Sequence, residues 1–195
     1  HTQRRRQRQM CIRDRDTPWT NEEVQSLYDA NINEIRIDEV GSVIDELDKN
    51  EDLSYTIYQS SENNKVTGYA IPIAGKGLWG TMYGYFAIEP DAETVKGITF
   101  YKHKETPGLG AEVDKDWFKN NFVGKKLTNK NGELVSIEVI KGYVSDTDPD
   151  APHKVDGISG ATITGTGLTT FLKSDLQKYE PYFAKVRSVN QIESL

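Results

Sequence analysis

The apolar positions at the start of the chain follow first a helical and then an alternating pattern. Residues 20–32 begin with a threonine followed closely by two glutamates, which is typical of a capped helix start. The apolar residues behind it recur at helical spacing, at Val24, Leu27, Tyr28 and Ile32. Ile35 and Ile37 then alternate with polar residues up to a break at Gly41. We therefore expect a helix followed by a strand.

Two pairs of alternating segments predict two β-hairpins. Residues 53–73 contain two runs in which apolar and polar side chains alternate, on either side of a polar turn at 61–64. Residues 81–105 repeat this pattern around a turn at 89–92. A glycine-rich break at 74–80 separates the two pairs.

The next part of the chain combines a short helix with one further strand. Residues 113–125 have the pattern of an amphipathic helix that ends at Gly124. The side chains expected to face inward are Trp117, Phe118 and Phe122. Residues 134–143 have the composition of a strand, and residues 144–155 form an acidic loop.

The order of these elements indicates the fold class. A final helix is expected over residues 166–186, with an end or a kink before Pro181, because proline disfavours helical geometry in the residue before it. Strands with helices mostly at the ends favour an α+β fold, with an antiparallel sheet and flanking helices, over alternating βαβ units. A chain of 195 residues with 36% hydrophobic residues can bury one ordinary core. A single domain is therefore expected.

Charge separates the first 15 residues from the rest. They carry six arginines and one aspartate, a net charge of +5, so the total of -6 leaves -11 on the other 180 residues. Because residues 1–15 lack hydrophobic periodicity, we expect a non-native or disordered basic leader in preference to an arm for nucleic acid or anionic lipid. Behind it we expect an N-terminal helix and strand layer at 16–65 and the main domain at 66–190. The acidic body argues against nucleic acid as a partner.

Several kinds of site are excluded by composition. The single cysteine, Cys11, lies in the basic leader, so the body has no disulfide framework, no Cys-ligated metal site and no thiol nucleophile. His153 has no partner at metal-ligand spacing, and no metal is expected. The sequence contains no run of about 18 apolar residues that could span a bilayer.

Residues 156–168, with the sequence DGISGATITGTGL, contain four glycines, three threonines and one serine, and nothing that titrates near neutral pH. Taken alone, these are turn formers leading into a helix. A helix N-terminus preceded by glycines also offers free N–H groups and the positive end of the helix dipole, which suit a phosphate. Neither a Walker A loop nor a GxGxxG motif is present. The stretch therefore favours a single phosphate, held or even esterified by a threonine.

This stretch also carries a resemblance to a known family. A flavinylation motif, Asp, two residues, Ser or Thr, Gly, Ala and Thr, is matched by Asp156, Ser159, Gly160, Ala161 and Thr162. In that motif the last threonine receives FMN through a phosphodiester bond. Residues 69–88 and 97–113 are similar to stretches of the C subunit of the sodium-translocating NADH:quinone oxidoreductases. The resemblance extends in unbroken order from Gly68 to Arg187.

The resemblance implies a cofactor site made of three loops. Thr162 is the attachment residue, and the other matched residues form the loop that a flavin transferase recognises. Glu105 and Thr106 are implied to hydrogen-bond the polar edge of the isoalloxazine ring. The rigid turn behind them consists of Pro107, Gly108, Leu109 and Gly110. Lys76 and Trp79 are implied to lie near the same pocket, and Trp79 is open to three roles: ring stacking, core packing and anchoring an interface.

The resemblance further implies an electron-relay subunit of a membrane-bound, sodium-pumping oxidoreductase, which carries covalent FMN and takes no hydride from NADH itself. Its partners would be the other subunits and, during maturation, the flavin transferase. The family's location is the bacterial inner membrane, with this domain on the periplasmic side and an N-terminal anchor that this sequence lacks. Two alternatives stay open: the homologous G subunit of the ion-translocating ferredoxin:NAD oxidoreductase complex, and a flavin-free scaffold domain. The segment GKGLWGTMYG favours the C subunit.

Overall fold

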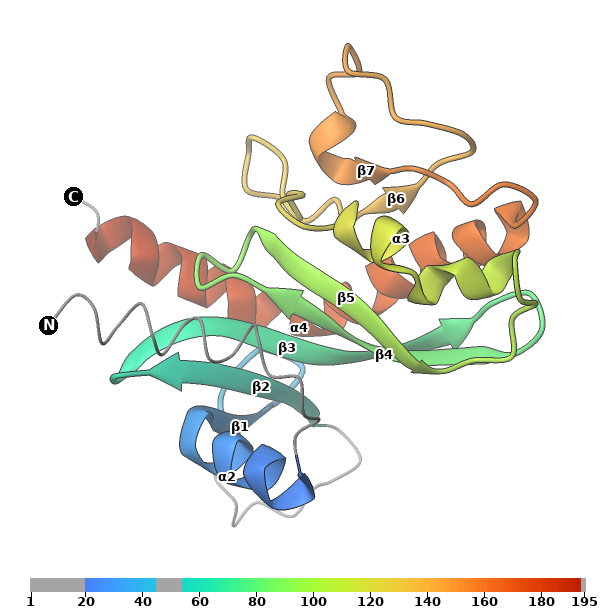
Figure 1. Ribbon diagram of the computed structural model, residues 1–195. Helices are drawn as coiled ribbons and strands as arrows, with labels where there is room; N and C mark the ends of the chain where they lie inside the picture. The colour runs from blue at the N-terminus through green and yellow to red at the C-terminus, as the bar shows by residue number, and fades with distance from the viewer. Residues whose placement is uncertain (1–19, 45–53, 194–195) are drawn as a thin grey trace, which may run out of the picture. The chain divides into compact units, whose positions relative to one another are not determined.

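A computed structural model describes residues 20–44 and 54–193 of the chain (Figure 1). The chain divides into two units, His1–Ile32 and Asn33–Leu195, and each is described by itself. The leader predicted at 1–15 lies outside the described residues.

The first unit contains helix α2 (Asn21–Asn31), which starts with a complete capping box. The Thr20 hydroxyl accepts a hydrogen bond from the backbone N–H of Glu23 at 3.2 Å, and the Glu23 carboxylate accepts one from the backbone N–H of Thr20 at 3.1 Å. Both donors would otherwise lack partners at the start of the helix. The predicted helix start is confirmed.

The second unit is built on a five-stranded sheet in which neighbours in sequence are neighbours in space. Its strands, in spatial order, are β1 (Ile32–Ile37), β2 (Tyr55–Glu62), β3 (Lys65–Lys76), β4 (Thr81–Ile88) and β5 (Val95–Lys102). Strands β2 to β5 pair antiparallel. Asn63 and Asn64 have φ values of 52° and 61° between β2 and β3, as two-residue hairpin turns require. Both predicted hairpins are confirmed, and the boundary predicted at residue 65 falls inside this one sheet.

Helix α4 (Thr162–Glu193) lies along one face of the sheet (Figure 1). Its buried hydrophobic side chains are Leu168, Phe171, Leu172, Leu176, Tyr179 and Phe183. The helix approaches β3 closely at Gly75, where a Cβ would lie 2.0 Å from the Cβ of Phe171. The Asp175 carboxylate accepts a hydrogen bond from the backbone N–H of Ala74 at 2.8 Å. These contacts fix the helix, and with it the position of its N-terminus, against the sheet.

The observed helix differs from the prediction at both ends. It begins at Thr162, a turn earlier than expected, and continues through Pro181 to Glu193. Proline removes one helical N–H donor and strains the preceding turn. Tyr179 and Phe183, two residues before and two after the proline, are buried in the core. Their packing therefore outweighs the lost hydrogen bond.

The segment between β5 and α4 forms a second layer of short elements. These are η2 (Gly110–Asp114), α3 (Asp116–Asn120), η3 (Ala151–His153), and a parallel pair of β6 (Glu138–Val139) and β7 (Lys154–Val155). The strand predicted at 134–143 is reduced to two residues. Ser136 and Gly142 have φ values of 69° and 85°, which are left-handed conformations that interrupt an extended chain.

The orientation predicted for the aromatic residues of α3 and the turn after it is right for two of the three. Phe118 and Phe122 are fully buried and meet edge to face, with ring centroids 5.4 Å apart. Trp117 was expected to face inward as well, but its side chain is 48% exposed. Successive residues of a helix point about 100° apart, so one turn that buries positions 118 and 122 turns position 117 outward.

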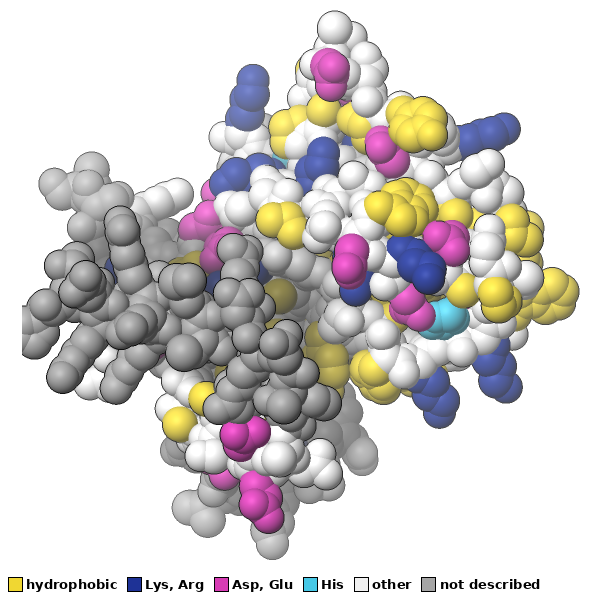
Figure 2. All heavy atoms as spheres, in the orientation of Figure 1, with side chains coloured by type: hydrophobic (Ala, Val, Ile, Leu, Met, Phe, Trp, Pro, Cys, Tyr) yellow, Lys and Arg dark blue, Asp and Glu magenta, His cyan; other side chains and the backbone are white. Residues whose placement is uncertain are grey.

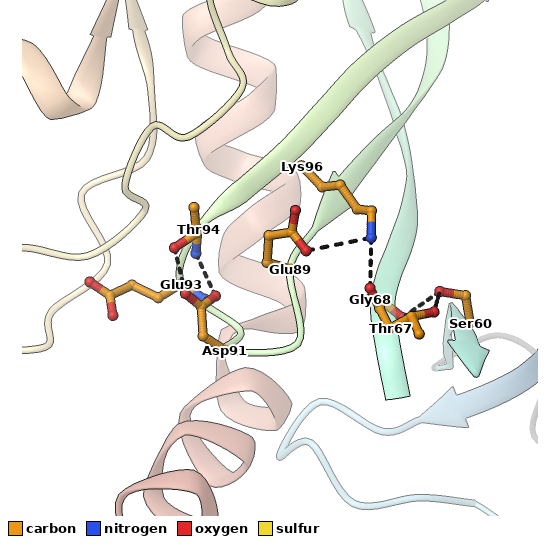
Figure 3. A network of polar contacts seen from close by, with 8 residues as sticks. All are labelled: Ser60, Thr67, Gly68, Glu89, Asp91, Glu93, Thr94 and Lys96. Carbon is orange, nitrogen blue, oxygen red and sulfur yellow. Dashed lines mark hydrogen bonds and ion pairs between the residues drawn. The ribbon is translucent and has the colours of Figure 1, made fainter. Parts of the chain in front are cut away.

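Polar contacts hold the turn between β4 and β5 (Figure 3). The Asp91 carboxylate accepts hydrogen bonds from the backbone N–H of Thr94 at 2.8 Å and from its hydroxyl at 2.5 Å. Burial by itself would raise the pKa of Asp91, but the bonds from Thr94 and the charge of Lys126 lower it below its usual value. Nearby, the Lys96 ammonium donates to the carbonyl of Thr67 at 2.7 Å. This end of the sheet is therefore held by charged groups.

Candidate functional site

The glycine-rich stretch places Thr162 at the first residue of α4. Gly160 has a φ of 74°, a conformation that favours glycine, and the backbone N–H of Ala161 donates to the carbonyl of Ile158 at 3.0 Å. Ala161 is buried, whereas Thr162 is exposed. The exposed hydroxyl of Thr162 therefore lies at the positive end of the dipole of a long helix.

The three threonines at the start of α4 differ in what their hydroxyls do. Thr164 is 1% exposed, and its hydroxyl donates to the Glu105 carboxylate at 2.5 Å. Thr166 is exposed, but its hydroxyl donates to the carbonyl of Thr162 at 3.0 Å. Within residues 20–44 and 54–193, the Thr162 hydroxyl has no hydrogen-bond partner. Of the three, Thr162 alone combines exposure with a free hydroxyl.

A pocket of about 990 Å³ opens beside Thr162. This volume lies at the upper end of the range for small-molecule sites. Six of the predicted site residues line it, namely Gly108, Asp156, Ser159, Gly160, Ala161 and Thr162. The segment 138–143 and the residues Glu112, Trp117 and Asn121 also line it. Figure 2 shows apolar side chains exposed on the surface over α3 and the segments beside it.

A second, smaller pocket of about 520 Å³ shares Thr162 and Thr166 with the first. The predicted residue Lys76 lines this second pocket and is absent from the lining of the first. The two segments meet closely, because a Cβ on Gly167 would lie 2.3 Å from the carbonyl oxygen of Lys76. Trp79 is 64% exposed and lines neither pocket, which excludes the core-packing role for it.

The loop at 105–110 lies next to the stretch at 156–162, as expected. The Thr106 carbonyl accepts hydrogen bonds from the N–H groups of Leu109 and Ala111, both at 3.1 Å, and Gly108 has a φ of 74°. The turn predicted at Pro107 to Gly110 is therefore present. The side chain of Leu109 reaches Gly160, where a Cβ would lie 2.8 Å from it. Pro107 and Thr106 are exposed.

Glu105 is turned inward from this loop. It is 5% exposed, and it lines neither pocket. Its carboxylate accepts hydrogen bonds from the backbone N–H of Trp79 at 3.0 Å and from the Thr164 hydroxyl. Gly77 and Gly110 make room for it, since a Cβ on either would lie 2.6 Å or less from a carboxylate oxygen. Glu105 thus joins the β3–β4 turn to the first turn of α4, behind the wall of the pocket.

Asp156 lies at the edge of the pocket and is half-buried. One of its carboxylate oxygens accepts a hydrogen bond from the backbone N–H of Val144 at 2.7 Å. The next residue, Gly157, donates its N–H to the carbonyl of Gly142 at 2.8 Å. Asp156 therefore holds the segment 140–144 against the glycine-rich stretch, a structural role that the motif alone does not reveal.

The two described histidines serve as local hydrogen-bonding groups. His103 accepts the backbone N–H of Glu105 at 3.1 Å through Nδ1, which leaves Nε2 to donate to Asp114 at 2.7 Å. His153 Nδ1 lies 2.6 Å from the carbonyl of Lys126. In the part of the chain that the structure describes, no three His, Cys, Asp or Glu side chains form a group that could hold a metal ion.

The structure adds lining residues that the sequence did not single out. They are Glu112, Trp117, Asn121, Glu138, Lys141 and Tyr143. The pattern of α3 pointed to the core for Trp117, and no local signal marks the others. Thr164, the partner of Glu105, lies outside the motif, and no local signal in the sequence marks it as buried.

Taken together, the arrangement offers an exposed acceptor hydroxyl, a helix N-terminus suited to a phosphate, and a pocket large enough for a multi-ring group. These features fit a phosphate-linked cofactor that extends from Thr162 into the pocket. The lining carries no paired nucleophile and base that would indicate hydrolytic or transfer chemistry by the side chains themselves.

Comparison with known proteins identifies the family of this chain. The model of a family described as FMN-binding domain matches residues 77–177. The C subunit of the Na(+)-translocating NADH-quinone reductase of Pseudomonas aeruginosa is 40% identical over 134 residues, covering 68% of this chain and 51% of that protein. Its counterpart from Haemophilus ducreyi is 42% identical over 129 residues, covering 65% of this chain and 48% of that protein. The chain thus spans about half the length of the curated relatives it matches.

Solved structures extend the similarity to the fold. The crystal structure of Shewanella oneidensis NqrC matches with a TM-score of 0.75 at 24% identity, covering 87% of this chain and 90% of that one. That of the C subunit of the Na(+)-translocating NADH-quinone reductase from Parabacteroides distasonis matches with a TM-score of 0.72 at 31% identity, covering 86% of each chain. The predicted α+β class is confirmed. No helix within the described residues combines the length and apolar character needed to cross a bilayer. The chain belongs to the FMN-binding domain family and, within it, to the C subunits of the Na(+)-translocating NADH-quinone reductases.

Proposed function

We propose that this chain is the electron-relay subunit of a membrane-bound, sodium-pumping NADH:quinone oxidoreductase, and that it carries FMN covalently attached to Thr162 through a phosphodiester bond. The observation that carries the proposal is the exposed, unbonded hydroxyl of Thr162, the last residue of the flavinylation motif. It is exposed at the start of α4 and lines both pockets, and its hydroxyl is free within the described residues. A threonine hydroxyl is a weak nucleophile, so attachment would need a flavin transferase to activate the donor.

The residues around Thr162 suit the two ends of such a cofactor. The unpaired N–H groups at the start of α4 would stabilise the negative charge of the phosphodiester. Lys76, which lines the second pocket with Thr162, would add a positive charge on the other side. The larger pocket would receive the ring. FMN supplies the redox chemistry when bound, and the protein supplies its position, its electrostatic surroundings and the exclusion of water.

A covalent tether fits a relay that works close to the surface. Thr162 and the neighbouring Ser159 and Gly160 are exposed, so a partner can approach the pocket closely. A tethered cofactor stays in place even where few contacts enclose it. Transfer of single electrons between redox centres also needs no side chain that donates a proton, which agrees with the absence of a paired acid and base in the pocket lining.

The partners in this proposal are the other subunits of the oxidoreductase and, during maturation, the flavin transferase that recognises residues 156–162. The proposed location is the bacterial inner membrane complex, with this domain on the periplasmic side. Charge complementarity would help to orient the acidic body of the domain among its neighbours.

The proposal is tested by producing the chain with and without a bacterial flavin transferase. We expect covalent FMN only when the transferase is present, seen as an added mass in the intact protein and as a fluorescent band in a denaturing gel. Peptide mapping is expected to place the added mass on the peptide that contains Thr162. A chain that acquires no added mass with an active transferase would contradict the proposal.

Substitutions of Asp156 give a second prediction. They separate its effect on the stability of the fold from its effect on the attachment of FMN. Replacing it by alanine removes the acceptor for the N–H of Val144 and is expected to lower the free energy of unfolding by about 1 kcal/mol. The Asp156→Asn variant keeps an amide oxygen as acceptor and is expected to retain most of that stability. If the carboxylate charge serves the attachment step, both variants acquire little covalent FMN. Urea unfolding and intact mass measure the two effects, and full loading of Asp156→Asn would refute the role in attachment.

A further inference from the structure

The face of the sheet opposite helix α4 carries a group of tyrosines. Met82 and Phe86 of β4 are fully buried in the core that α4 also lines. Because side chains alternate between the two faces of a strand, Tyr83 and Tyr85 point to the other face. The ring of Tyr101, from β5, lies 6.3 Å from that of Tyr83 and 5.6 Å from that of Tyr85, measured between centroids. Tyr85 is 38% exposed and Tyr101 is 63% exposed, so the rings form one aromatic surface outside the core.

The charge of this face differs from that of the rest of the chain. Strands β3, β4 and β5 contain no Asp or Glu, although the chain has 30 of these residues. The Lys102 ammonium lies 5.5 Å from the centre of the Tyr83 ring, and Lys104 follows two residues beyond the end of β5. Both lysines are exposed, and within residues 20–44 and 54–193 neither forms an ion pair. The aromatic surface therefore has positive charge at its edge that no carboxylate neutralises there.

We propose that this tyrosine–lysine surface docks on the headgroup region of a bilayer that contains anionic lipid. The surface consists of Tyr83, Tyr85, Tyr101, Lys102 and Lys104. Tyrosine is enriched at the interface between membrane and water, because its ring is apolar and its hydroxyl is polar. A lysine close to an anionic membrane raises binding by roughly fivefold. The acidic remainder of the chain is repelled by the same lipids, so charge complementarity orients the domain with this face toward the membrane.

The shape of the surface favours a lipid layer over an acidic protein as the occupant. It is the open face of an antiparallel sheet, and none of its side chains lines either of the two pockets at Thr162. The cross-strand partners of the tyrosines on this face are Pro72, Ala74 and Thr99, which are exposed and uncharged. A folded partner is recognised through many hydrogen bonds, which these short side chains do not supply. A fluid headgroup layer needs only area and charge.

Flotation with lipid vesicles tests the proposal on the chain without FMN, so the result does not depend on flavin attachment. Vesicles of phosphatidylcholine are compared with vesicles that also contain about 30% phosphatidylglycerol, which is anionic. The parent is expected to float with the anionic vesicles at about 20 mM salt and to be released at about 200 mM salt, because exposed charges are screened. It is expected to stay behind when the vesicles are neutral.

A matched pair of variants separates this surface from the overall charge. Lys102→Glu/Lys104→Glu is expected to lower the partition coefficient by about tenfold or more. Lys130→Glu/Lys173→Glu makes the same change in net charge at two exposed lysines outside the surface, of which Lys173 lies on α4. This control is expected to retain most of the binding.

Substitutions of the tyrosines test the aromatic part of the surface at constant charge. Tyr85→Ser/Tyr101→Ser removes two exposed rings and is expected to weaken binding several-fold. Tyr85→Phe/Tyr101→Phe keeps the rings and is expected to bind like the parent. Thermal melting establishes that each variant is folded.

Three outcomes would overturn the proposal. The first is a parent that does not float with anionic vesicles at low salt. The second is an equal loss of binding in both lysine pairs, which would show a general effect of charge. The third is retention on immobilised polyglutamate without flotation, which would identify an acidic protein as the occupant. The proposed function is decided separately, by the mass of the chain produced with the flavin transferase.

Discussion

Replacing Thr162 by alanine is expected to abolish covalent attachment of FMN, with little effect on the fold. The oxygen of the Thr162 hydroxyl would form the ester bond. Within the described residues, neither of the other two threonine hydroxyls at the start of α4 is both exposed and free. Because the side chain is exposed and its hydroxyl makes no hydrogen bond there, its loss is expected to change the free energy of unfolding by no more than about 0.5 kcal/mol. In-gel flavin fluorescence and intact mass measure the loss of the cofactor.

The same helix provides matched controls for this experiment. Thr166 is also exposed and lies in the first two turns of α4. Its hydroxyl donates a hydrogen bond to the carbonyl of Thr162. Thr166→Ala is therefore expected to keep full loading, and Thr162→Ser, which retains a hydroxyl, is expected to keep part of it. An undiminished fluorescent band from Thr162→Ala would place the attachment elsewhere.

Replacing Glu105 by alanine is expected to produce the largest loss of stability among these variants, about 2 to 4 kcal/mol, because one buried and one part-buried donor lose their common acceptor. The donors are the backbone N–H of Trp79 and the hydroxyl of Thr164. Each belongs to a different segment, so the change would also loosen the β3–β4 turn from the first turn of α4. We expect slower flavin attachment at Thr162 as a result. Urea unfolding measures the loss in the free energy of unfolding, and the m-value is expected to stay unchanged.

Glu105→Gln separates this positioning role from direct contact with the cofactor. The glutamine oxygen can still accept from Trp79, and the Thr164 hydroxyl can rotate to accept from the new amide group. We therefore expect a loss of about 1 kcal/mol or less in the glutamine variant. If Glu105 only positions the pocket wall, the redox titration of its loaded form matches that of the parent. A shifted titration with intact stability would instead support the ring contact implied by the family resemblance.

The sequence by itself determined the elements whose signals are local. Alternation and turn residues define the hairpins of β2 to β5, since a strand's two faces and a tight turn follow from neighbouring residues. The capping box at Thr20 and Glu23 likewise acts within one turn of helix. The motif at 156–162 indicated the proposed attachment residue, Thr162, because the motif consists of residues that are adjacent along the chain.

The tertiary structure decided which side chains face the pocket. Thr164 and Thr166 both lie outside the motif, and Thr164 is buried because Glu105, nearly sixty residues away, accepts its hydroxyl in the interior. Trp117 is apolar and was expected in the core, yet the burial of Phe118 leaves it no place there. Burial and hydrogen-bond pairing depend on segments that meet only after folding, so a local pattern cannot specify them. The physical reason is that a short helix turn or loop has several nearly equal orientations, and long-range packing selects one.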